Sequence, residues 1–162
     1  MKRFARGLGL IVVASATLVL LLGAAPAFHW TGGTRVVPTL AEALPQAGTA
    51  ALLVFFTVDC PSCFGELFEA RYLLEKGGWP VEVVGVSSAP RDILEAFLEK
   101  YAWTRPVVSD RRKALFRKYH IAMVPHAVLV QGSTTLYEDD PHADRARARE
   151  DLKKCLEKLF SR

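Results

Sequence analysis

Cysteine is scarce in this sequence, and ordered sets of metal ligands are absent. Only three cysteines occur in 162 residues, and neither a second CxxC nor an HxxxH motif is present. Because a structural zinc site needs four ligands, we expect none here and predict no bound metal. The sequence also has no internal repeats and no low-complexity tracts, and its composition does not change along the chain after residue 28. The chain therefore has room for one domain with one core.

A strong excess of basic charge is missing once the N-terminus is set aside. Three of the 21 Lys and Arg residues, Lys2, Arg3 and Arg6, stand before the first apolar stretch, where no Asp or Glu accompanies them. The rest of the chain has 18 basic and 17 acidic residues, so it is nearly neutral. Nucleic-acid binding needs a basic face, so we expect no nucleic-acid partner.

The N-terminus has the pattern of a targeting segment. Residues 8–27 are uncharged and follow the basic residues directly, and about 20 such residues suffice to cross a bilayer as a helix. The positive-inside rule then places the chain from Phe28 onward outside the cytoplasm. We predict a signal-anchor in residues 1–27 and one domain in residues 28–162, giving a cell-membrane protein with a single N-terminal pass. Ala25-Pro26-Ala27 also permits cleavage near Ala27, which would yield a secreted or periplasmic protein.

Alternating strand and helix patterns predict an α/β domain. Residues 50–58 and 81–86 are apolar and rich in β-branched side chains, as buried strands are. Helical patterns follow each of them, from Pro61 to Gly77-Gly78 and again after Pro90, with a stripe formed by Ile93, Leu94, Phe97, Leu98 and Tyr101. Strand and helix in alternation imply parallel pairing.

The rest of the chain predicts shorter elements and a change to antiparallel pairing. Residues 126–130 and 134–137 flank a turn and predict a hairpin, after which Pro141 is expected to begin a last helix. Weaker patterns indicate strands near residues 28–30, 34–37 and 106–109, a helix at 40–44, and a helix at 111–119 capped by Asp110.

The motif Cys60-Pro61-Ser62-Cys63 stands where a buried strand ends and a helix begins, which is typical of a redox-active CxxC. A thiol at a helix N-terminus faces unpaired backbone N–H groups and the positive end of the helix dipole, and both stabilise a thiolate. Thiolate is the attacking species in disulfide exchange. We predict Cys60 as the exposed nucleophile and Cys63 as the resolving thiol, with no dissociable cofactor.

Two segments resemble the thioredoxin superfamily, and within it the membrane-anchored TlpA/ResA/CcmG-like proteins: FFTVDCPSC at residues 55–63 and YHIAMVPHAVLV at residues 119–130. The resemblance implies a thioredoxin-like fold, with a central mixed β-sheet flanked by helices on both faces. It also implies that the Val124–Pro125 bond is cis and that Val124 and Pro125 shape a substrate-binding edge.

The same resemblance implies the activity and the partners. It indicates a thiol:disulfide oxidoreductase that acts on exported proteins with thiols or disulfides and exchanges electrons with a membrane donor or acceptor. Reduction of partner disulfides, for example during cytochrome c maturation, is the expected direction.

Three positions depart from the usual pattern of that family. Asp59 replaces a Trp, and its charge would disfavour the Cys60 thiolate unless the carboxylate caps the helix instead. Val54 replaces a buried Asp, which removes that route for proton transfer. His126 replaces a Thr, and it is either a group near Cys60 that stabilises the thiolate when protonated or a surface-exposed histidine. The third cysteine, Cys155, is expected to pack as a small hydrophobic residue, because it lies on the apolar stripe predicted for the last helix, which also contains Leu152, Leu156, Leu159 and Phe160.

Three other functions fit part of the sequence. Cys60, Cys63 and His126 have the soft ligand types that copper prefers, so a copper-binding metallochaperone is the main alternative. Thr57 and Cys60 match a peroxidatic TxxC motif, but Leu53 stands where that motif has a proline. A binding module without catalysis is a further alternative, because a fold does not determine a function.

Overall fold

The computed structural model describes residues 35–160. The predicted signal-anchor at residues 1–27 and the predicted strand near residues 28–30 lie outside this range. Among residues 35–160, no helix has both the length and the apolar character needed to span a bilayer.

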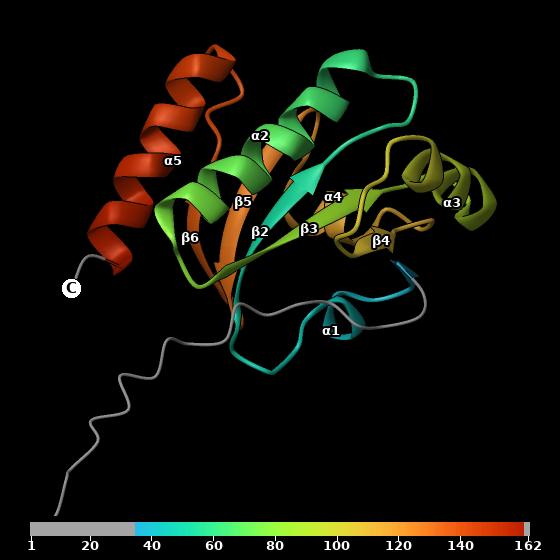
Figure 1. Cartoon of the computed structure of the whole chain (residues 1–162), viewed down its shortest axis with the longest axis horizontal. Coiled ribbons are helices and arrows are strands. Elements are labelled where there is room, and N and C mark those ends of the chain that lie inside the picture. Colours follow the sequence, from blue (N-terminus) through green and yellow to red (C-terminus); the bar gives the residue numbers. More distant parts are fainter. Residues whose placement is uncertain (1–34, 161–162) are drawn as a thin grey trace, which may run out of the picture.

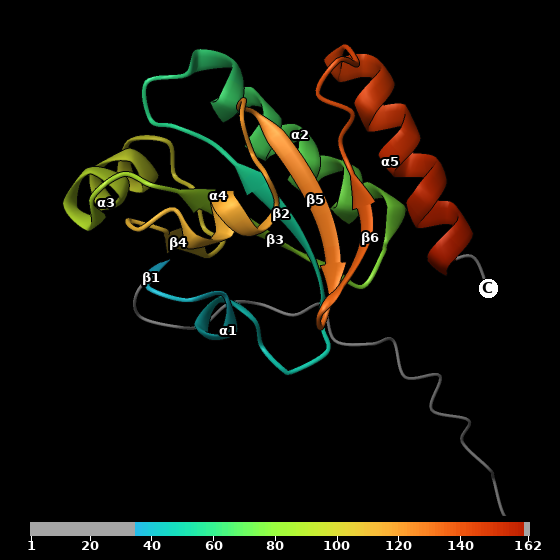
Figure 2. The same cartoon turned by 180° about the vertical axis from the view of Figure 1, so that it is seen from behind.

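A six-stranded mixed sheet forms the centre of the fold, in the order β1-β4-β3-β2-β5-β6 (Figures 1 and 2). The pairs β1/β4, β4/β3 and β3/β2 are parallel, whereas β2/β5 and β5/β6 are antiparallel. The predicted change from parallel pairing to an antiparallel hairpin is confirmed. The strands are β1 Val36–Val37, β2 Ala50–Phe55, β3 Val81–Ser87, β4 Val107–Ser109, β5 His126–Gln131 and β6 Thr134–Glu138.

Helices cover both faces of this sheet, as predicted. They are α1 Leu40–Ala43, α2 Pro61–Gly77, α3 Arg91–Lys100, α4 Ala114–Lys118 and α5 Arg145–Phe160. Side chains of α2, α3 and α5 pack in one core cluster with one face of the sheet, and α1 and α4 pack in a second cluster on the other face (Figures 1 and 2).

Strand β2 shows why its sequence is a continuous apolar run. All six of its residues are buried, because alternate side chains enter opposite clusters. Leu52 and Val54 pack in the cluster of α2, while Leu53 and Phe55 pack in the cluster of α4. In a strand buried on both sides, polar residues do not alternate with apolar ones, so the two-residue period of the strand is not visible in the sequence.

Several predicted element boundaries and two predicted apolar stripes need correction. The strand predicted at residues 50–58 ends at Phe55. The last helix begins at Arg145 and not at Pro141, because the Asp144 carboxylate accepts the Arg147 N–H and caps the first turn. Ile93 and Leu159 are 45% and 43% exposed, so the predicted apolar stripes are narrower than expected.

The Asp110 carboxylate caps the first turn of a helix as predicted, but that helix is shorter than residues 111–119 and its N-cap residue is Lys113. Its buried carboxylate accepts the backbone N–H groups of Ala114, Leu115 and Phe116 at 2.8, 2.8 and 3.1 Å. These are N–H groups of the first turn, which have no partner inside the helix. Helix α4 therefore starts at Ala114.

Candidate functional site

The junction of β2 and α2 positions the two predicted redox cysteines. Helix α2 begins at Pro61, where the missing N–H of proline costs no hydrogen bond. Cys60 is the N-cap residue, and its Sγ accepts the Cys63 N–H at 3.2 Å. The Cys60 N–H donates to the Thr57 carbonyl oxygen at 3.3 Å, which closes the turn before the helix.

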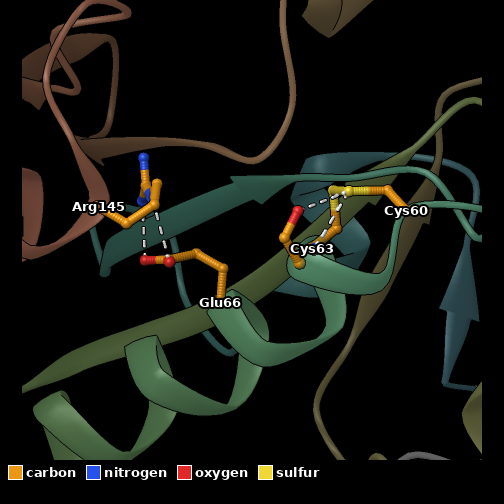
Figure 3. Close-up of a disulfide and its surroundings, with 5 residues drawn as sticks. Cys60, Cys63, Glu66 and Arg145 are labelled. Carbon is orange, nitrogen blue, oxygen red and sulfur yellow. Dashed lines mark hydrogen bonds and ion pairs between the residues drawn. A yellow bond between two sulfur atoms is a disulfide. The ribbon is translucent and has the colours of Figure 1, made fainter.

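Cys60 and Cys63 form a disulfide across the first turn of α2, with their Cα atoms 5.3 Å apart (Figure 3). Cys63 is fully buried in the core cluster under α2, and Cys60 is half-buried at its edge. Of the two sulfur atoms, that of Cys60 is therefore the one within reach of a second protein.

The Ser62 hydroxyl is a close neighbour of this sulfur that the motif analysis did not single out. Its Oγ lies 3.3 Å from Cys60 Sγ. Together with the Cys63 N–H it places two hydrogen-bond donors beside one sulfur atom. Its position two residues after the N-cap was the available signal, because the first helical turn folds back toward that residue.

The Val124–Pro125 peptide bond is cis, as the resemblance implied. Pro125 lies at the same end of the sheet as the disulfide, because His126 opens β5 and pairs with Phe55, the last residue of β2. Val124 packs against the cluster that contains Cys63. The substrate-binding role of Val124 and Pro125 stays a prediction.

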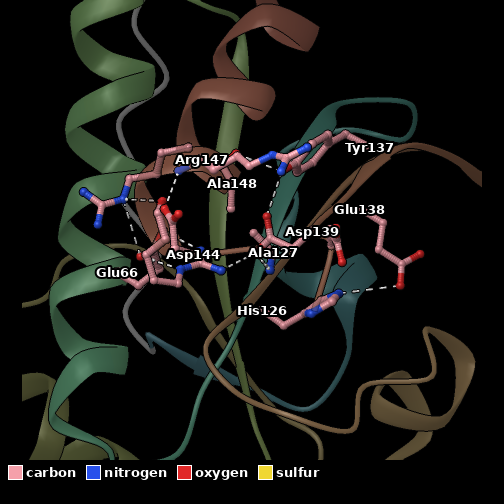
Figure 4. A network of polar contacts seen from close by, with 12 residues as sticks. Glu66, His126, Ala127, Tyr137, Glu138, Asp139, Asp144, Arg147 and Ala148 are labelled. Atoms are coloured by element: carbon pink, nitrogen blue, oxygen red, sulfur yellow. Dashed lines mark hydrogen bonds and ion pairs between the residues drawn. The ribbon is translucent and has the colours of Figure 1, made fainter. Parts of the chain in front are cut away.

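His126 is neither exposed nor in contact with Cys60 in the described part of the chain. It is 6% exposed, and it pairs with Phe55, whose side chain packs in the cluster on the α4 face. Directly paired residues share a face of the sheet, so the imidazole lies on the face opposite Cys63. Its Nε2 is 3.5 Å from Glu138 Oε1 (Figure 4). The alternative of a surface-exposed histidine is wrong, and an effect of His126 on Cys60 stays a prediction.

Asp59 is exposed and does not cap α2, because Cys60 occupies the N-cap position. The capping alternative is therefore wrong, while an effect of the Asp59 charge on Cys60 stays a prediction. Val54 stands where the family pattern has a buried Asp, and it is itself fully buried in the cluster that contains Cys63.

A buried ionic network connects the CxxC helix with the strand that follows Pro125. Arg145 binds Glu66 of α2 at 2.8 Å (Figure 3) and Asp139 at 2.8 Å. Glu66 and Asp139 are 5% and 3% exposed. The Asp139 carboxylate also accepts the Ala127 N–H at 2.8 Å, two residues after Pro125. Nothing in the sequence pattern indicated this network, because its members are far apart in the chain.

Two groups of this network have shifted pKa values. Burial opposes the charge of Arg145, but hydrogen bonds and attraction to Glu66 and Asp139 outweigh it and raise the pKa of the guanidinium. Burial, followed by the charge of Asp139, raises the pKa of Tyr137 well above its usual value. The Tyr137 hydroxyl lies 2.9 Å from Asp139 Oδ1 and stays protonated.

The three proposed copper ligands do not come together. Within residues 35–160, no group of three His, Cys, Asp or Glu side chains is placed to hold a metal ion. Cys60 and Cys63 lie at the start of α2, whereas His126 points to the other face of the sheet. The structure does not favour the metallochaperone alternative.

The strand order, the disulfide at the N-terminus of α2 and the cis proline before β5 define a thioredoxin-like protein. More narrowly, the chain belongs to the AhpC/TSA family, whose model matches residues 23–138.

Among known proteins, the chain is similar to sporulation thiol-disulfide oxidoreductase A of Bacillus subtilis (strain 168). The two are 30% identical over 93 residues, which are 54% of this chain and 56% of the relative. The chain thus spans little more than half the length of this curated relative.

Solved structures show the same fold. The crystal structure of StoA from Bacillus subtilis matches with a TM-score of 0.53 and 25% identity, over 68% of this chain and 84% of that one. A secreted Mycobacterium tuberculosis disulfide oxidoreductase, described as homologous to E. coli DsbE, matches with a TM-score of 0.53 and 22% identity. That match covers 70% of this chain and 84% of the other.

Proposed function

We propose that this protein is an extracytoplasmic thiol:disulfide oxidoreductase that reduces disulfides of exported partner proteins with the CPSC dithiol. The observation that supports this best is the Cys60–Cys63 disulfide at the N-terminus of α2, with Cys60 at the edge and Cys63 buried. The names of two similar proteins, the curated relative and the mycobacterial structure, describe disulfide oxidoreductases.

The reaction proceeds through one mixed disulfide. The Cys60 thiolate attacks one sulfur of the partner disulfide, a Cys60–partner S–S bond forms, and the other partner sulfur leaves as a thiolate and takes a proton. Cys63 then loses its proton and attacks Cys60 Sγ, which closes the Cys60–Cys63 disulfide and releases the second partner thiol. Two electrons pass to the partner together with one proton from Cys63 and one from the solvent, and a membrane electron donor must reduce the protein again.

The local geometry supports a reactive Cys60. The Cys63 N–H and the Ser62 hydroxyl are within hydrogen-bond distance of Cys60 Sγ, and hydrogen bonds to a charged group favour the charged form. We further propose that Val124 and Pro125 hold the extended partner segment beside this sulfur.

Trapping of the mixed disulfide tests the reaction. The full chain with Cys63→Ser should form a stable, dithiothreitol-sensitive adduct with an oxidised test protein such as insulin, because no thiol remains to resolve it. Cys60→Ser should form none, and both variants should reduce insulin at the background rate. An adduct with Cys60→Ser, or full activity of either variant, would contradict the assigned roles.

The reduction potential tests the direction. After equilibration of the full chain with glutathione, a potential near that of thioredoxin, about −270 mV, supports a reductase. A potential near that of DsbA, about −120 mV, would show that the protein oxidises its partners instead.

The cellular location is tested by fractionation and N-terminal sequencing. A protein that retains Met1 in the membrane fraction, with a domain accessible from outside the cytoplasm, supports the signal-anchor. A soluble extracytoplasmic protein that begins near Phe28 would show cleavage, and a cytoplasmic protein would contradict the proposal.

A further inference from the structure

Helix α4 and the turn before it carry a cluster of basic side chains that the proposed reaction does not use. This α4 basic patch consists of five exposed residues: Arg111, Arg112, Lys113, Arg117 and Lys118. No Asp or Glu occurs in the sequence between Asp110 and Glu138. Asp110 itself is buried, and its carboxylate accepts backbone N–H groups of α4.

The five charges have no counterions in the part of the chain that the structure describes. Within residues 35–160 none of the five is in an ion pair, whereas eight other Lys and Arg residues are. Arg117 donates to the Arg112 carbonyl oxygen, and the Lys118 ammonium lies 4.9 Å from the centre of the Tyr119 ring. Neither contact neutralises charge. Five close positive charges repel one another, so an external anionic group would stabilise this surface.

The patch leads directly into the segment that carries the cis proline. Residues 119–123 connect α4 to Val124-Pro125, and along them His120 and Met123 are exposed, Met123 at 55%. A shallow depression lined by Lys113, Phe116, Arg117, His120, Ile121 and Ala122 joins the patch to this segment. Figure 2 shows α4 on the face of the sheet opposite α2. A polypeptide held at Pro125 would thus have its flanking residues beside the patch.

We propose that the α4 basic patch is the docking surface for acidic residues that flank the disulfide of the partner protein. This inference rests on the proposed oxidoreductase function and specifies the class of partner. Opposite charges on two proteins raise the association rate by roughly 10- to 1,000-fold, and this gain falls with ionic strength. The acidic residues Glu42 and Glu138 belong to elements on the same face, but neither forms an ion pair with the patch.

Charge reversal in the full chain tests the docking surface. The test variant is Arg111→Glu/Arg112→Glu, since both side chains are exposed and acidic residues near a helix N-terminus are favourable. The matched control is Lys100→Glu/Lys158→Glu, which makes the same change in net charge on α3 and α5. The substrates are two disulfide peptides that differ only in three Glu or three Gln residues beside the cystine.

At low salt, the wild type and the control should reduce the Glu peptide about tenfold faster than the Gln peptide, and this advantage should vanish at high salt. The Arg111→Glu/Arg112→Glu variant should lose the advantage and keep the rate for the Gln peptide. An equal rate for both peptides with the wild type, or an undiminished advantage with the variant, would overturn the proposal.

Two further outcomes are distinguishable. Binding of anionic lipid vesicles that requires Arg111 and Arg112, with no preference for the Glu peptide, would assign the patch to a membrane surface and overturn the proposal. Failure of the wild type to reduce even the Gln peptide would contradict the oxidoreductase function, and the docking surface with it.

Discussion

The sulfur of Cys60 has two hydrogen-bond donors within reach, and they differ in how firmly they are held. The Cys63 N–H belongs to the helix backbone, so its position follows from the start of α2 at Pro61. The Ser62 hydroxyl belongs to an exposed side chain and can rotate away. A substitution can remove the hydroxyl without changing the helix.

We predict that Ser62→Ala shifts alkylation of reduced Cys60 to higher pH, because the thiolate loses a donor that contributes about 1 kcal/mol. The pH dependence of iodoacetamide labelling, read by mass spectrometry at Cys60, measures the shift. Ser62→Thr retains a hydroxyl and should behave as the wild type. An unchanged profile in Ser62→Ala would mean that the hydroxyl does not contact the thiolate.

Cys155 should behave as a poorly reactive thiol. Burial raises the pKa of its thiol, and the charge of Lys158 offsets part of this effect. In the oxidised protein Cys155 is the single free thiol of the three cysteines, so alkylation at increasing pH reports it directly. We expect a midpoint above that of an unhindered cysteine and a further rise in Lys158→Met. A midpoint at the ordinary value would contradict the burial effect.

At the scale of elements, Arg145 joins three parts of the fold. It begins α5, and its two ion pairs reach Glu66 on α2 and Asp139, whose carboxylate binds the backbone of β5. The CxxC helix and the strand after the cis proline are thus connected through one guanidinium. The predicted stripe of α5 explains its apolar contacts, but not this connection.

We predict that Arg145→Met lowers the free energy of unfolding by about 3 kcal/mol, because it removes the short ion pair of each of two buried carboxylates. Glu66 then keeps only its longer pair with Arg149 at 3.7 Å, and Asp139 keeps only neutral hydrogen-bond donors. Urea denaturation of the oxidised full chain measures the change. The matched control is Arg147→Met, whose pair with Asp151 is exposed on both sides, and it should cost less than about 1 kcal/mol. Equal effects of the two substitutions would show that burial does not strengthen the Arg145 pairs.

At the scale of the whole molecule, a nearly neutral net charge conceals an uneven distribution. The balance of 18 basic and 17 acidic residues after position 27 includes the α4 basic patch, which has no ion pairs within the described residues, and α5, whose exposed charges pair along the helix. The total led us to expect no nucleic-acid partner, but a total does not show where on the surface the basic residues gather. Contributions of single buried charges to stability are equally hidden in such a total.

Glu82 on β3 should make stability depend on pH. Burial raises the pKa of this carboxyl above its ordinary value of 4.5, and attraction to Arg105 offsets only part of the effect. The folded protein therefore holds the proton more tightly than the unfolded chain, so this group's contribution to stability falls as the pH rises from about 4.5 through the raised pKa.

We predict that Glu82→Gln removes this loss, so that the stability of the variant relative to the wild type increases with pH across that window. Arg105 keeps its pair with Glu75 at 2.9 Å. Urea denaturation at several pH values from about 4 to 7 measures the difference. Glu95→Gln, at an exposed pair with Arg91, serves as the control. Parallel pH curves for Glu82→Gln and the wild type would contradict the raised pKa.

The sequence by itself determined the order of the elements, the start of α2 at Pro61 and the hairpin after Pro125. These depend on side-chain periodicity and on capping groups a few residues away, which are visible in a linear chain. The start of α5 was predicted at Pro141 but lies at Arg145. The reason is again local, because the Asp144 carboxylate accepts the Arg147 N–H and caps the first turn.

Only the tertiary structure decided which distant groups meet. The face of the sheet that His126 enters depends on its register with Phe55, and a shift of one residue would reverse it. Glu66, Asp139 and Arg145 come together only because α2, the residue after β6 and the start of α5 lie next to one another in the fold. Within residues 35–160, the α4 basic patch has no ion pairs, whereas basic residues of α5 pair with acidic ones. Pairing of charges across the fold is a property of packing, which no local pattern contains.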